Sequence, residues 1–542
     1  IEFFDNDAQA FELNSKIKIQ GNYSKAWPQK GFSIKAKDDF DGYPITYKLF
    51  PDKPNITEYN GFNIRNAGSD WNTCHIRDRL NHKTTQQLTH LDIMDGRPCI
   101  LFINGIYFGV YEIREKQDKY YVASNGNVDK DKIDFLEFDG SVIEGSNKGF
   151  LTMVNDIGNN NMAIPSNYDS AKKLIDIENF VDYFITETYI VNIDWLGTYT
   201  NNIKYWRPNN PIGKWRYILW DTDLSHAFLA AFDGADTTNM LGRAINPPTS
   251  NPHSVMLKSL LANTEFKNYF TNRYCDLLNT IFRSYKFKKK ADDLHDEMLP
   301  EMARHFALWG SGGSTLPTPW NEFIGRSTDV PSWEANIDTM EQFMYSRPFY
   351  AFNQLQNQFS LAKQVDVTLD VYPAGAGTIK LNTIYPDSLP WTGVYMDGVP
   401  ITMTATANAG YTFVHWKSPN LISTPNTNSS VTINVTQNEL FIAYFDAIDS
   451  IFDNAFALFP NPFTNNFTIS YQLSADASVS VQLFNCLGQK VAEIISSDET
   501  QTAGSHQLKV DSGKYPLASG VYFVKFTTEG VSKMIKLVKT KD

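Results

Sequence analysis

The chain has 542 residues, of which 42% are apolar and 14% aromatic, too many residues for one core and enough apolar ones for several domains. Its formal net charge is −12 and it has no long run of Lys or Arg, which argues against nucleic acid or an anionic membrane as the main partner. No stretch approaches the roughly 20 apolar residues that a membrane-spanning helix needs. The chain begins at Ile1, in a segment unlike a signal peptide, so we expect a processed or truncated start.

The cysteines are too scattered for a structural zinc site, because no CxxC pair or Cys/His cluster has ligand spacing. In an exported chain two of them could pair, Cys74 with Cys99. We favour the simpler reading, in which the cysteines are small buried apolar residues.

Residues 1–363 mix short strands with helices, which predicts an α+β domain. Two apolar runs, 99–105 and 107–115, are joined at Asn104 and Gly105, a strong hairpin signal because both residues tolerate positive φ. Further along the chain, apolar periodicity predicts helices over 254–282, 288–309 and 337–359.

The first segment with a chemical signal is 17–37. Here a strand leads into a turn at Gly21, and a second strand follows Lys30 and carries Lys35. A glycine turn followed by a lysine beside a strand can cover and grip phosphates. An ordinary surface hairpin with solvated lysines gives the same pattern.

The second segment is 191–206, where Asp194 precedes Asn201 and Asn202. A carboxylate can orient an acceptor hydroxyl, and an amide oxygen a few residues later can bind a metal. The alternative is an Asx-rich loop that hydrogen-bonds to itself.

The third segment is 214–228, an aromatic strand that ends in Asp221 and Asp223. Two carboxylates two residues apart at a strand end suit a divalent cation. The alternative is a helix N-cap formed by Asp223 or Ser225. His226 could reach a metal, but we favour a capping or packing role.

These segments occur in the order that protein kinases use. Together with FNIRNAGSDWNTCHIRDRL (62–80), LFINGIYFGVYEIREKQDKYY (101–121) and the helical tail, they resemble the spore-coat CotH family of atypical protein kinases. The resemblance covers roughly residues 1–360. It implies a kinase-like fold, ATP as phosphate donor, and Mg²⁺ or Mn²⁺ as metal.

The resemblance also implies roles for the polar residues of the second and third segments. Asp194 resembles the catalytic-loop aspartate that handles the acceptor hydroxyl. Asn202, or Asn201, resembles the metal-binding asparagine, and Asp221 the magnesium aspartate. Asp223 is a further candidate metal ligand.

For the nucleotide, the resemblance points to Lys30 as the phosphate-contacting lysine, with Lys35 as the second candidate. Glu115 lies where the family keeps a glutamate that could pair with this lysine, or it is a surface carboxylate. Arg77 and Asp78 match a family pair that either supports the nucleotide site or forms a structural ion pair. We favour the structural role.

Two features depart from the family pattern. The first turn has a single glycine, with Lys25 in place of the usual basic residue, and the interval between Asp194 and Asn201 is longer. A degenerate pseudokinase therefore stays open as an alternative.

Residues 366–447 alternate apolar and polar positions and are rich in Thr and Val, which predicts a small all-β domain. The segments ITMTATANAGYTFVHW (401–416) and LFIAYF (440–445) resemble the divergent internalin-type β repeats of bacterial surface proteins.

Residues 455–542 follow a linker at 446–454 and again alternate every second residue, which predicts a β-sandwich. The segments PNPF (460–463), LFN (483–485), LGQ (487–489) and LASGVY (517–522) resemble the C-terminal type A sorting domain of the type IX secretion route of Bacteroidota. Late basic residues on an edge strand would discourage edge-to-edge pairing. The resemblance implies export through the type IX machinery and a secreted or cell-surface location.

We therefore predict a multidomain protein, with an α+β atypical kinase-like domain before two small all-β domains. The predicted activity is transfer of the ATP γ-phosphate to Ser or Thr hydroxyls of surface or extracellular proteins. Two alternatives stay open. One is a non-catalytic surface scaffold or adhesion protein, and the other is a calcium-binding structural module that uses Asp221 and Asp223.

Overall fold

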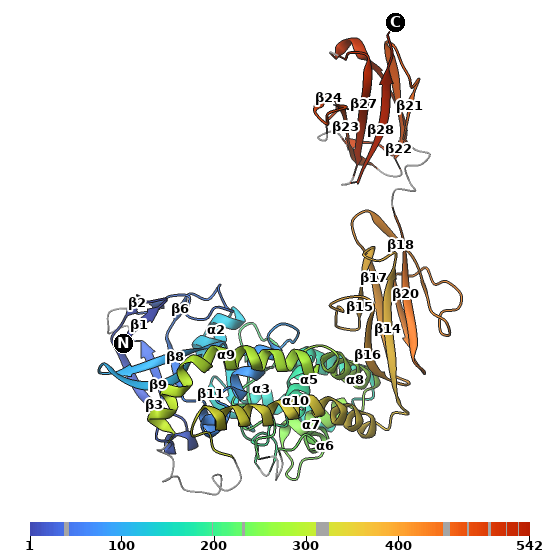
Figure 1. Cartoon of the computed structure of the whole chain (residues 1–542). Coiled ribbons are helices and arrows are strands. Elements are labelled where there is room, and N and C mark those ends of the chain that lie inside the picture. Colours follow the sequence, from blue (N-terminus) through green and yellow to red (C-terminus); the bar gives the residue numbers. More distant parts are fainter. Residues whose placement is uncertain are drawn as a thin grey trace. The chain divides into compact units, whose positions relative to one another are not determined.

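The computed structural model describes residues 1–36, 43–197, 199–229, 234–310, 325–447, 456–473, 476–496, 500–515, 517–528 and 531–541 (Figure 1). The chain divides into two compact units, one of residues 1–364 with 394–399 and one of residues 365–393 with 400–542. Most of the predicted linker, and the predicted start of the last domain at residue 455, lie outside the described residues. Within the described residues, no helix is long and apolar enough to cross a membrane.

A five-stranded antiparallel sheet, in the order β3-β4-β7-β9-β8, opens the first unit. The predicted hairpin forms between its last two members, and its turn residues Asn104 and Gly105 have φ of 52° and 76°. The bounds of the strands are β3 (Ser15–Gln20), β4 (Gly31–Ala36), β7 (Gly61–Arg65), β8 (Gly96–Ile103) and β9 (Ile106–Glu115). Short strands flank this sheet: β1 (Glu2–Asp5), β2 (Ala8–Glu12), β5 (Ile45–Thr46) and β6 (Glu58–Tyr59).

The two faces of this sheet differ because side chains alternate along each strand. One face is apolar and buries Ile34, Phe62 and Ile113 in a common cluster. The other face is polar, and the register places Ser33 opposite Asn63, and Asn63 opposite Arg114.

A second sheet has the order β11-β10-β12-β13. Its strands are β10 (Ile133–Glu137), β11 (Ser141–Glu144), β12 (Lys204–Pro208) and β13 (Arg216–Ile218). Helix α5 (Ile177–Ile190) packs beside β13 and is buried continuously from Asn179 to Ile190. It ends where Val191 takes a left-handed conformation with φ of 54°. The segments that follow α5 and β13 carry the polar residues singled out in the sequence.

Among the other helices of this unit, α9 and α10 run side by side (Figure 1). The continuous helix expected over 254–282 is two helices, because the Asn263 side chain accepts a hydrogen bond from the Phe266 amide and starts a new helix. The bounds are α1 (Arg77–Thr85), α2 (Lys119–Gly126), α3 (Lys148–Asn159), α4 (Pro165–Leu174), α6 (Met240–Ile245), α7 (Pro252–Leu260), α8 (Thr264–Leu278), α9 (Ser284–Trp309) and α10 (Val330–Gln358).

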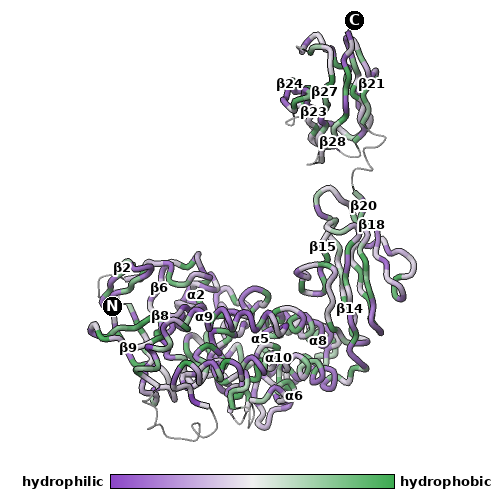
Figure 2. The backbone as a smooth tube through the Cα atoms, in the orientation of Figure 1, coloured by the Kyte–Doolittle hydropathy of each residue, from purple (hydrophilic) through white to green (hydrophobic). Residues whose placement is uncertain are grey.

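The chain after α10 is all β, as the alternating pattern predicts, and Figure 2 shows that alternation along the strands. Its first part holds two sheets, in the orders β16-β14-β20-β18 and β15-β17-β19. The pair β14–β20 is parallel, whereas β18–β20 and both pairs of the smaller sheet are antiparallel. The bounds are β14 (Gln364–Tyr372), β15 (Gly377–Leu381), β16 (Trp391–Met396), β17 (Pro400–Ala407), β18 (Tyr411–Lys417), β19 (Ser430–Asn434) and β20 (Glu439–Ala447).

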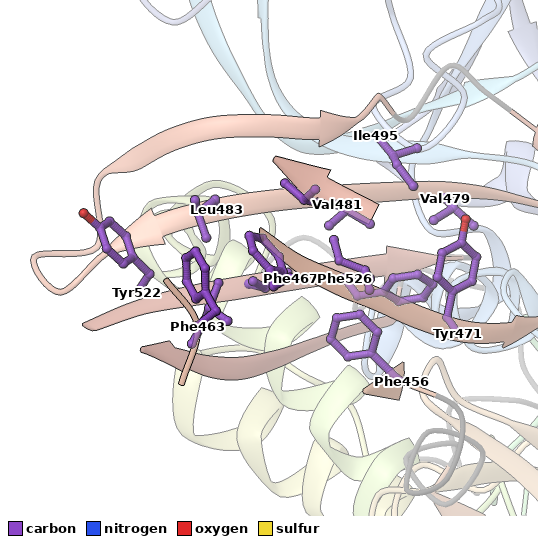
Figure 3. Close-up of a cluster of buried hydrophobic side chains, with 14 of the residues drawn as sticks. Phe456, Phe463, Phe467, Tyr471, Val479, Val481, Leu483, Ile495, Tyr522 and Phe526 are labelled. Atoms are coloured by element: carbon purple, nitrogen blue, oxygen red, sulfur yellow. The ribbon is translucent and has the colours of Figure 1, made fainter. Parts of the chain in front are cut away.

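The C-terminal part is a sandwich of two antiparallel sheets, β21-β22-β26 and β24-β23-β27-β28. Phe467 of one sheet and Val481 and Phe526 of the other are fully buried in one cluster between them (Figure 3). The bounds are β21 (Phe456–Phe459), β22 (Asn466–Leu473), β23 (Ala477–Asn485), β24 (Lys490–Ile495), β25 (Thr500–Gln501), β26 (Gly504–Asp511), β27 (Gly520–Thr528) and β28 (Val531–Lys539).

All four cysteines are free thiols, so the alternative Cys74–Cys99 disulfide does not form. Cys74 and Cys275 are buried, as expected for small apolar residues, Cys99 is half-buried, and Cys486 is exposed.

Candidate active site

A cleft of about 560 Å³ opens in the first unit, between the turn after β3 and the loops that follow α5 and β13. The turn contributes Gly21, whose φ is 108°. From the two loops, Asp194, Asn202 and Asp221 line the same cleft. Segments more than 170 residues apart in sequence therefore meet at one place.

Asp221 follows the buried end of β13 and has a φ of 56°. A left-handed conformation costs an L-residue roughly 1–2 kcal/mol, so the surrounding structure must hold it there. The side chain of Asp221 is 30% exposed, whereas that of Asp223 is 5% exposed. Asp221 therefore presents its carboxylate to the cleft, while Asp223 lies behind it.

Arg65, at the end of β7, binds both of these carboxylates. Its Nη2 lies 2.5 Å from Asp221 Oδ1 and 2.7 Å from Asp223 Oδ2, and the Ser69 amide also donates to Asp223 Oδ2 at 2.8 Å. Burial and the neighbouring charge of Asp221 raise the pKa of Asp223 well above its ordinary value. Arg65 is thus the internal counter-charge of the acidic pair.

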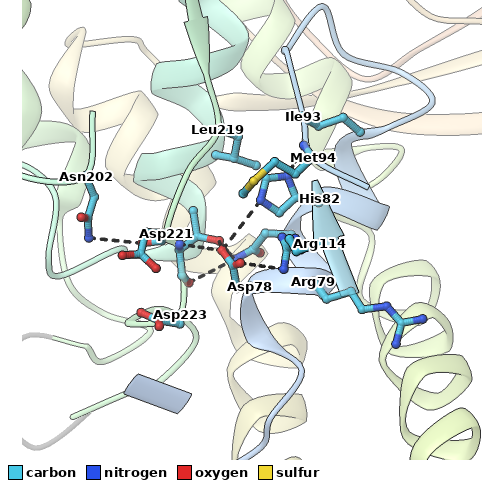
Figure 4. A network of polar contacts seen from close by, with 12 residues as sticks. Asp78, Arg79, His82, Ile93, Met94, Arg114, Asn202, Leu219, Asp221 and Asp223 are labelled. Carbon is cyan, nitrogen blue, oxygen red and sulfur yellow. Dashed lines mark hydrogen bonds and ion pairs between the residues drawn. The ribbon is translucent and has the colours of Figure 1, made fainter. Parts of the chain in front are cut away.

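Asp78 of α1 supports this arrangement from below (Figure 4). It accepts hydrogen bonds from the amide and the hydroxyl of Thr222 at 2.8 and 2.9 Å, and Arg114 Nη1 lies 2.8 Å away. Burial opposes its ionisation, but Arg114 and Arg65 hold the pKa of Asp78 well below its ordinary value. A charged Asp78 therefore fixes the backbone between Asp221 and Asp223.

The loop after α5 holds the other carboxylate. Asn202 Nδ2 donates to Asp194 Oδ2 at 3.1 Å and to the backbone oxygen of Asp221 at 3.3 Å. Burial, together with the charge of Asp221, raises the pKa of Asp194. The amide of Asp194 donates to Asn192 Oδ1, so the loop also bonds to itself, as the Asx-loop alternative expects.

Four candidates do not line this cleft in the structure. The ammonium of Lys30 donates to the backbone oxygens of Lys25 and Trp27, both at 2.6 Å. Lys35 is exposed on β4, on the polar face of the sheet, and does not line the cleft. The predicted convergence of Lys30 with Asp194 and Asp221 is therefore not what the structure shows.

Glu115 and Arg77 are engaged elsewhere. Glu115 pairs with Lys53 rather than Lys30 and accepts a hydrogen bond from the Asp95 amide at 2.8 Å, on the opposite face of β9 from Arg114. Arg77 is buried and binds Asp70, so the expected Arg77–Asp78 pair is replaced by separate pairs with other partners.

The helix-cap alternative for the third segment is not found, because among the described residues after Asp223 the next helix is α6, which begins at Met240. The Ser225 hydroxyl donates to the Thr222 oxygen at 2.7 Å. His226 is fully buried and packs on the rings of Phe287 and Phe343, which is the packing role expected for it.

The family model for CotH kinase protein matches residues 17–351, which is more than half of the chain. The chain belongs to the CotH kinase family. A divergent InlB B-repeat domain matches residues 367–449, and a secretion system C-terminal sorting domain matches residues 457–540. The sorting domain marks a secreted or cell-surface protein and implies an interaction with the type IX secretion machinery.

No curated protein matches the chain. Among the solved structures that match is that of dimeric latent PorU from Porphyromonas gingivalis, with 12% identity over 33% of this chain and 18% of the PorU chain. Its TM-score of 0.14 is too low to bear on the fold.

The CotH domain also contains functional candidates that the sequence pattern did not single out. Arg65, Arg114 and Lys204 line the cleft or an adjoining chamber. The only local signal is the alternation in FNIR (62–65) and in YEIR (111–114), which places each arginine on the polar face of its strand. Their partners lie far away in sequence, so no spacing rule identifies them.

The cleft presents oxygen atoms that would suit magnesium or manganese. Asp221, Asp194 and the amide of Asn202 carry hard oxygens, and Mg²⁺ commonly takes one or two carboxylates together with substrate phosphates. Among the described residues there is no cluster of three or more His, Cys, Asp or Glu side chains with metal-binding geometry. A calcium site needs six to eight oxygens. Arg65 also occupies the space between Asp221 and Asp223 that a calcium ion would take.

Proposed function

We propose that this protein is a secreted or surface kinase that transfers the ATP γ-phosphate to Ser or Thr hydroxyls of surface proteins. The observation that carries the proposal is the hydrogen-bonded group of Asp194, Asn202 and Asp221 on one cleft. Phosphoryl transfer depends mainly on positioning and on neutralising charge, and these three side chains supply hard oxygen ligands and a carboxylate base.

In this proposal Asp221 and Asn202 hold Mg²⁺ or Mn²⁺, which would neutralise charge on the phosphates. Asp194 accepts the proton of the acceptor hydroxyl, whose oxygen bonds to the γ-phosphorus as the bond to the β-phosphate oxygen breaks and ADP leaves. A raised pKa makes the Asp194 carboxylate a better base than an ordinary aspartate. Arg65 keeps Asp221 and Asp223 in place through its paired contacts.

Two observations favour the non-catalytic alternative. Lys30, the predicted phosphate lysine, bonds to its own turn, and Arg65 already pairs with both Asp221 and Asp223. A scaffold built on the CotH fold, presented with a B-repeat on the cell surface, would have these features without chemistry.

The test is label incorporation by the full-length chain from radiolabelled ATP with Mn²⁺. Asp221→Asn removes a metal ligand but keeps the shape of the side chain, and Asp338→Asn is the control because Asp338 is exposed on α10. We expect label in the wild type and the control, and a loss of about 100-fold or more in Asp221→Asn. No label and no rise in melting temperature with nucleotide would establish the scaffold instead. Stabilisation by calcium alone would establish the calcium-binding module.

A further inference from the structure

A second chamber of about 220 Å³ adjoins the cleft on the polar face of the N-terminal sheet. The two spaces share Gln20, Arg65 and Trp220 as lining residues. The described residues that line the chamber include no Asp or Glu, but they include the cations Arg65, Arg114, Lys116 and Lys204. The cleft holds the carboxylates, and the chamber beside it is lined by positive charge.

The sheet register explains why these groups meet. Ser33, Asn63 and Arg114 lie directly opposite one another on β4, β7 and β9, and all three line the chamber. Because side chains in such a row point to the same face, three neighbouring strands contribute one polar floor. Lys204, the first residue of β12, comes from the second sheet.

Some nitrogen atoms of the buried arginines in this chamber have no hydrogen-bond partner in the described structure. Arg114 is 2% exposed, and its Nη1 contacts Asp78 and Glu112, whereas its Nε and Nη2 are buried without a hydrogen-bond partner in the described structure. Arg65 Nε also has no hydrogen-bond partner, although it lies 3.9 Å from Asp78 Oδ2. A buried donor without a partner is unfavourable, so an anion that accepts hydrogen bonds from these groups regains that free energy.

Lys204 is also buried without a close carboxylate partner. Its ammonium lies 3.7 Å from the centre of the Trp220 ring, and within the described residues it forms no ion pair. A buried cation held by an aromatic ring is stabilised when an anion approaches it.

We propose that this chamber is an anion site that binds phosphate groups through Lys204, Arg114 and Arg65. This inference rests on the proposed kinase function: the chamber would bind the α- and β-phosphates of ATP, which are not transferred. Charge-assisted hydrogen bonds from guanidinium groups are the strong contacts of phosphate sites. The family resemblance implies that Lys30 contacts the phosphates. In this proposal the cations of the chamber take over that role and neutralise the leaving diphosphate.

The experiment measures binding of inorganic pyrophosphate to the full-length chain by titration calorimetry without a divalent metal. Lys204→Met keeps the length of the side chain but removes its charge, and Lys173→Met is the control because Lys173 is exposed on α4. We expect Lys204→Met to raise the Kd about tenfold or more and the control to leave it unchanged. Lys116→Met is a milder second variant, because the Lys116 side chain is 25% exposed and also pairs with Asp118. We expect it to raise the Kd by a few-fold while the melting temperature is retained.

Unchanged pyrophosphate affinity in both Lys204→Met and Lys116→Met, with melting temperatures like the wild type, would overturn the anion site. If Asp221→Asn still abolished labelling in that case, the proposed kinase function would stand without the chamber. Conversely, pyrophosphate binding that depends on Lys204 in a chain that never incorporates label would support the anion site and overturn the kinase.

Discussion

The side-chain amide of Asn192 donates a hydrogen bond to the buried carboxyl group of Glu187 over 2.9 Å. The same side chain accepts from the amide of Asp194 at 3.1 Å. One helical turn before Glu187, the Tyr183 hydroxyl accepts from the indole of Trp195 at 2.9 Å. Helix α5 therefore holds the loop on both sides of Asp194, through groups that never touch the cleft.

Glu187→Gln tests the charge state of this anchor. Burial raises the pKa of Glu187 to about 8 from an ordinary value of 4.5, so the folded chain keeps a proton that the unfolded chain releases between these values. The stabilising contribution of the protonated Glu187 carboxyl group is complete below pH 4.5 and is lost as the pH rises towards 8. Relative to Glu187→Gln, the free energy of unfolding of the wild type should fall by up to about 1.4 kcal/mol per pH unit in this window.

Urea unfolding at several pH values between 5 and 9 measures this difference. Glu334→Gln is the matched control, because Glu334 is exposed on α10 and its substitution should leave the pH dependence unchanged. A constant difference between the wild type and Glu187→Gln across the window would mean that Glu187 is ionised in the folded chain.

Gly68→Ala should disable the site without removing any of its charged groups. Gly68 has a φ of 66°, and a Cβ there would collide with Asp223 Oδ2 and the Arg65 guanidinium. We expect at least a tenfold loss of label incorporation, because small displacements of catalytic groups are costly. Gly105→Ala is the control, since Gly105 has a φ of 76° but nothing within 4 Å of an added Cβ. Equal activity of the two variants would show that the Arg65 bridge is dispensable.

The sequence predicts the acidic part of the site because its signals are local. Asp194 follows a buried helix and Asp221 a buried strand, and polar residues at the ends of apolar elements tend to gather at one edge of a domain. The same reasoning predicts the all-β C-terminal half, since alternation with period two is a local pattern. It fails over 254–282, where the apolar periodicity continues although Asn263 caps a new helix.

The cations of the site, Arg65 and Arg114, could not be predicted from the sequence, because their positions depend on packing between distant segments. Arg65 contacts a carboxylate 156 positions away in sequence. Arg114 and Glu115 are adjacent on β9 and face opposite sides of the sheet, and the sequence does not show which side meets the cleft. The long, flexible side chain of Lys30 can reach in several directions. Its ammonium bonds to the backbone oxygens of Lys25 and Trp27, and the sequence does not show that the turn brings these oxygens within reach.

Lys30→Met should therefore lower the stability of the fold and leave the affinity for nucleotide almost unchanged. Loss of the contacts to Lys25 and Trp27 should lower the free energy of unfolding by about 1–2 kcal/mol. The Kd for ADP with Mn²⁺, measured by titration calorimetry, should change less than twofold. A tenfold weaker affinity with unaltered stability would show that Lys30 reaches the phosphates, as the family resemblance implies.

Deletion of residues 457–542 should stop export while leaving the CotH domain folded. The buried cluster around Phe467, Val481 and Phe526 holds only residues from Phe456 onward, so the deletion leaves the first unit, residues 1–364 with 394–399, intact. We expect the shortened chain to accumulate in the periplasm, as measured by immunoblotting of periplasmic and surface fractions from a host with type IX secretion. Fusion of residues 457–542 to a folded periplasmic reporter is the control and should reach the surface. A deletion of 367–447 cannot serve, because residues 394–399 belong to the first unit and Tyr395 is buried there against Asp276. Surface delivery of the shortened chain, or retention of the fusion in the periplasm, would contradict the role of the sorting domain.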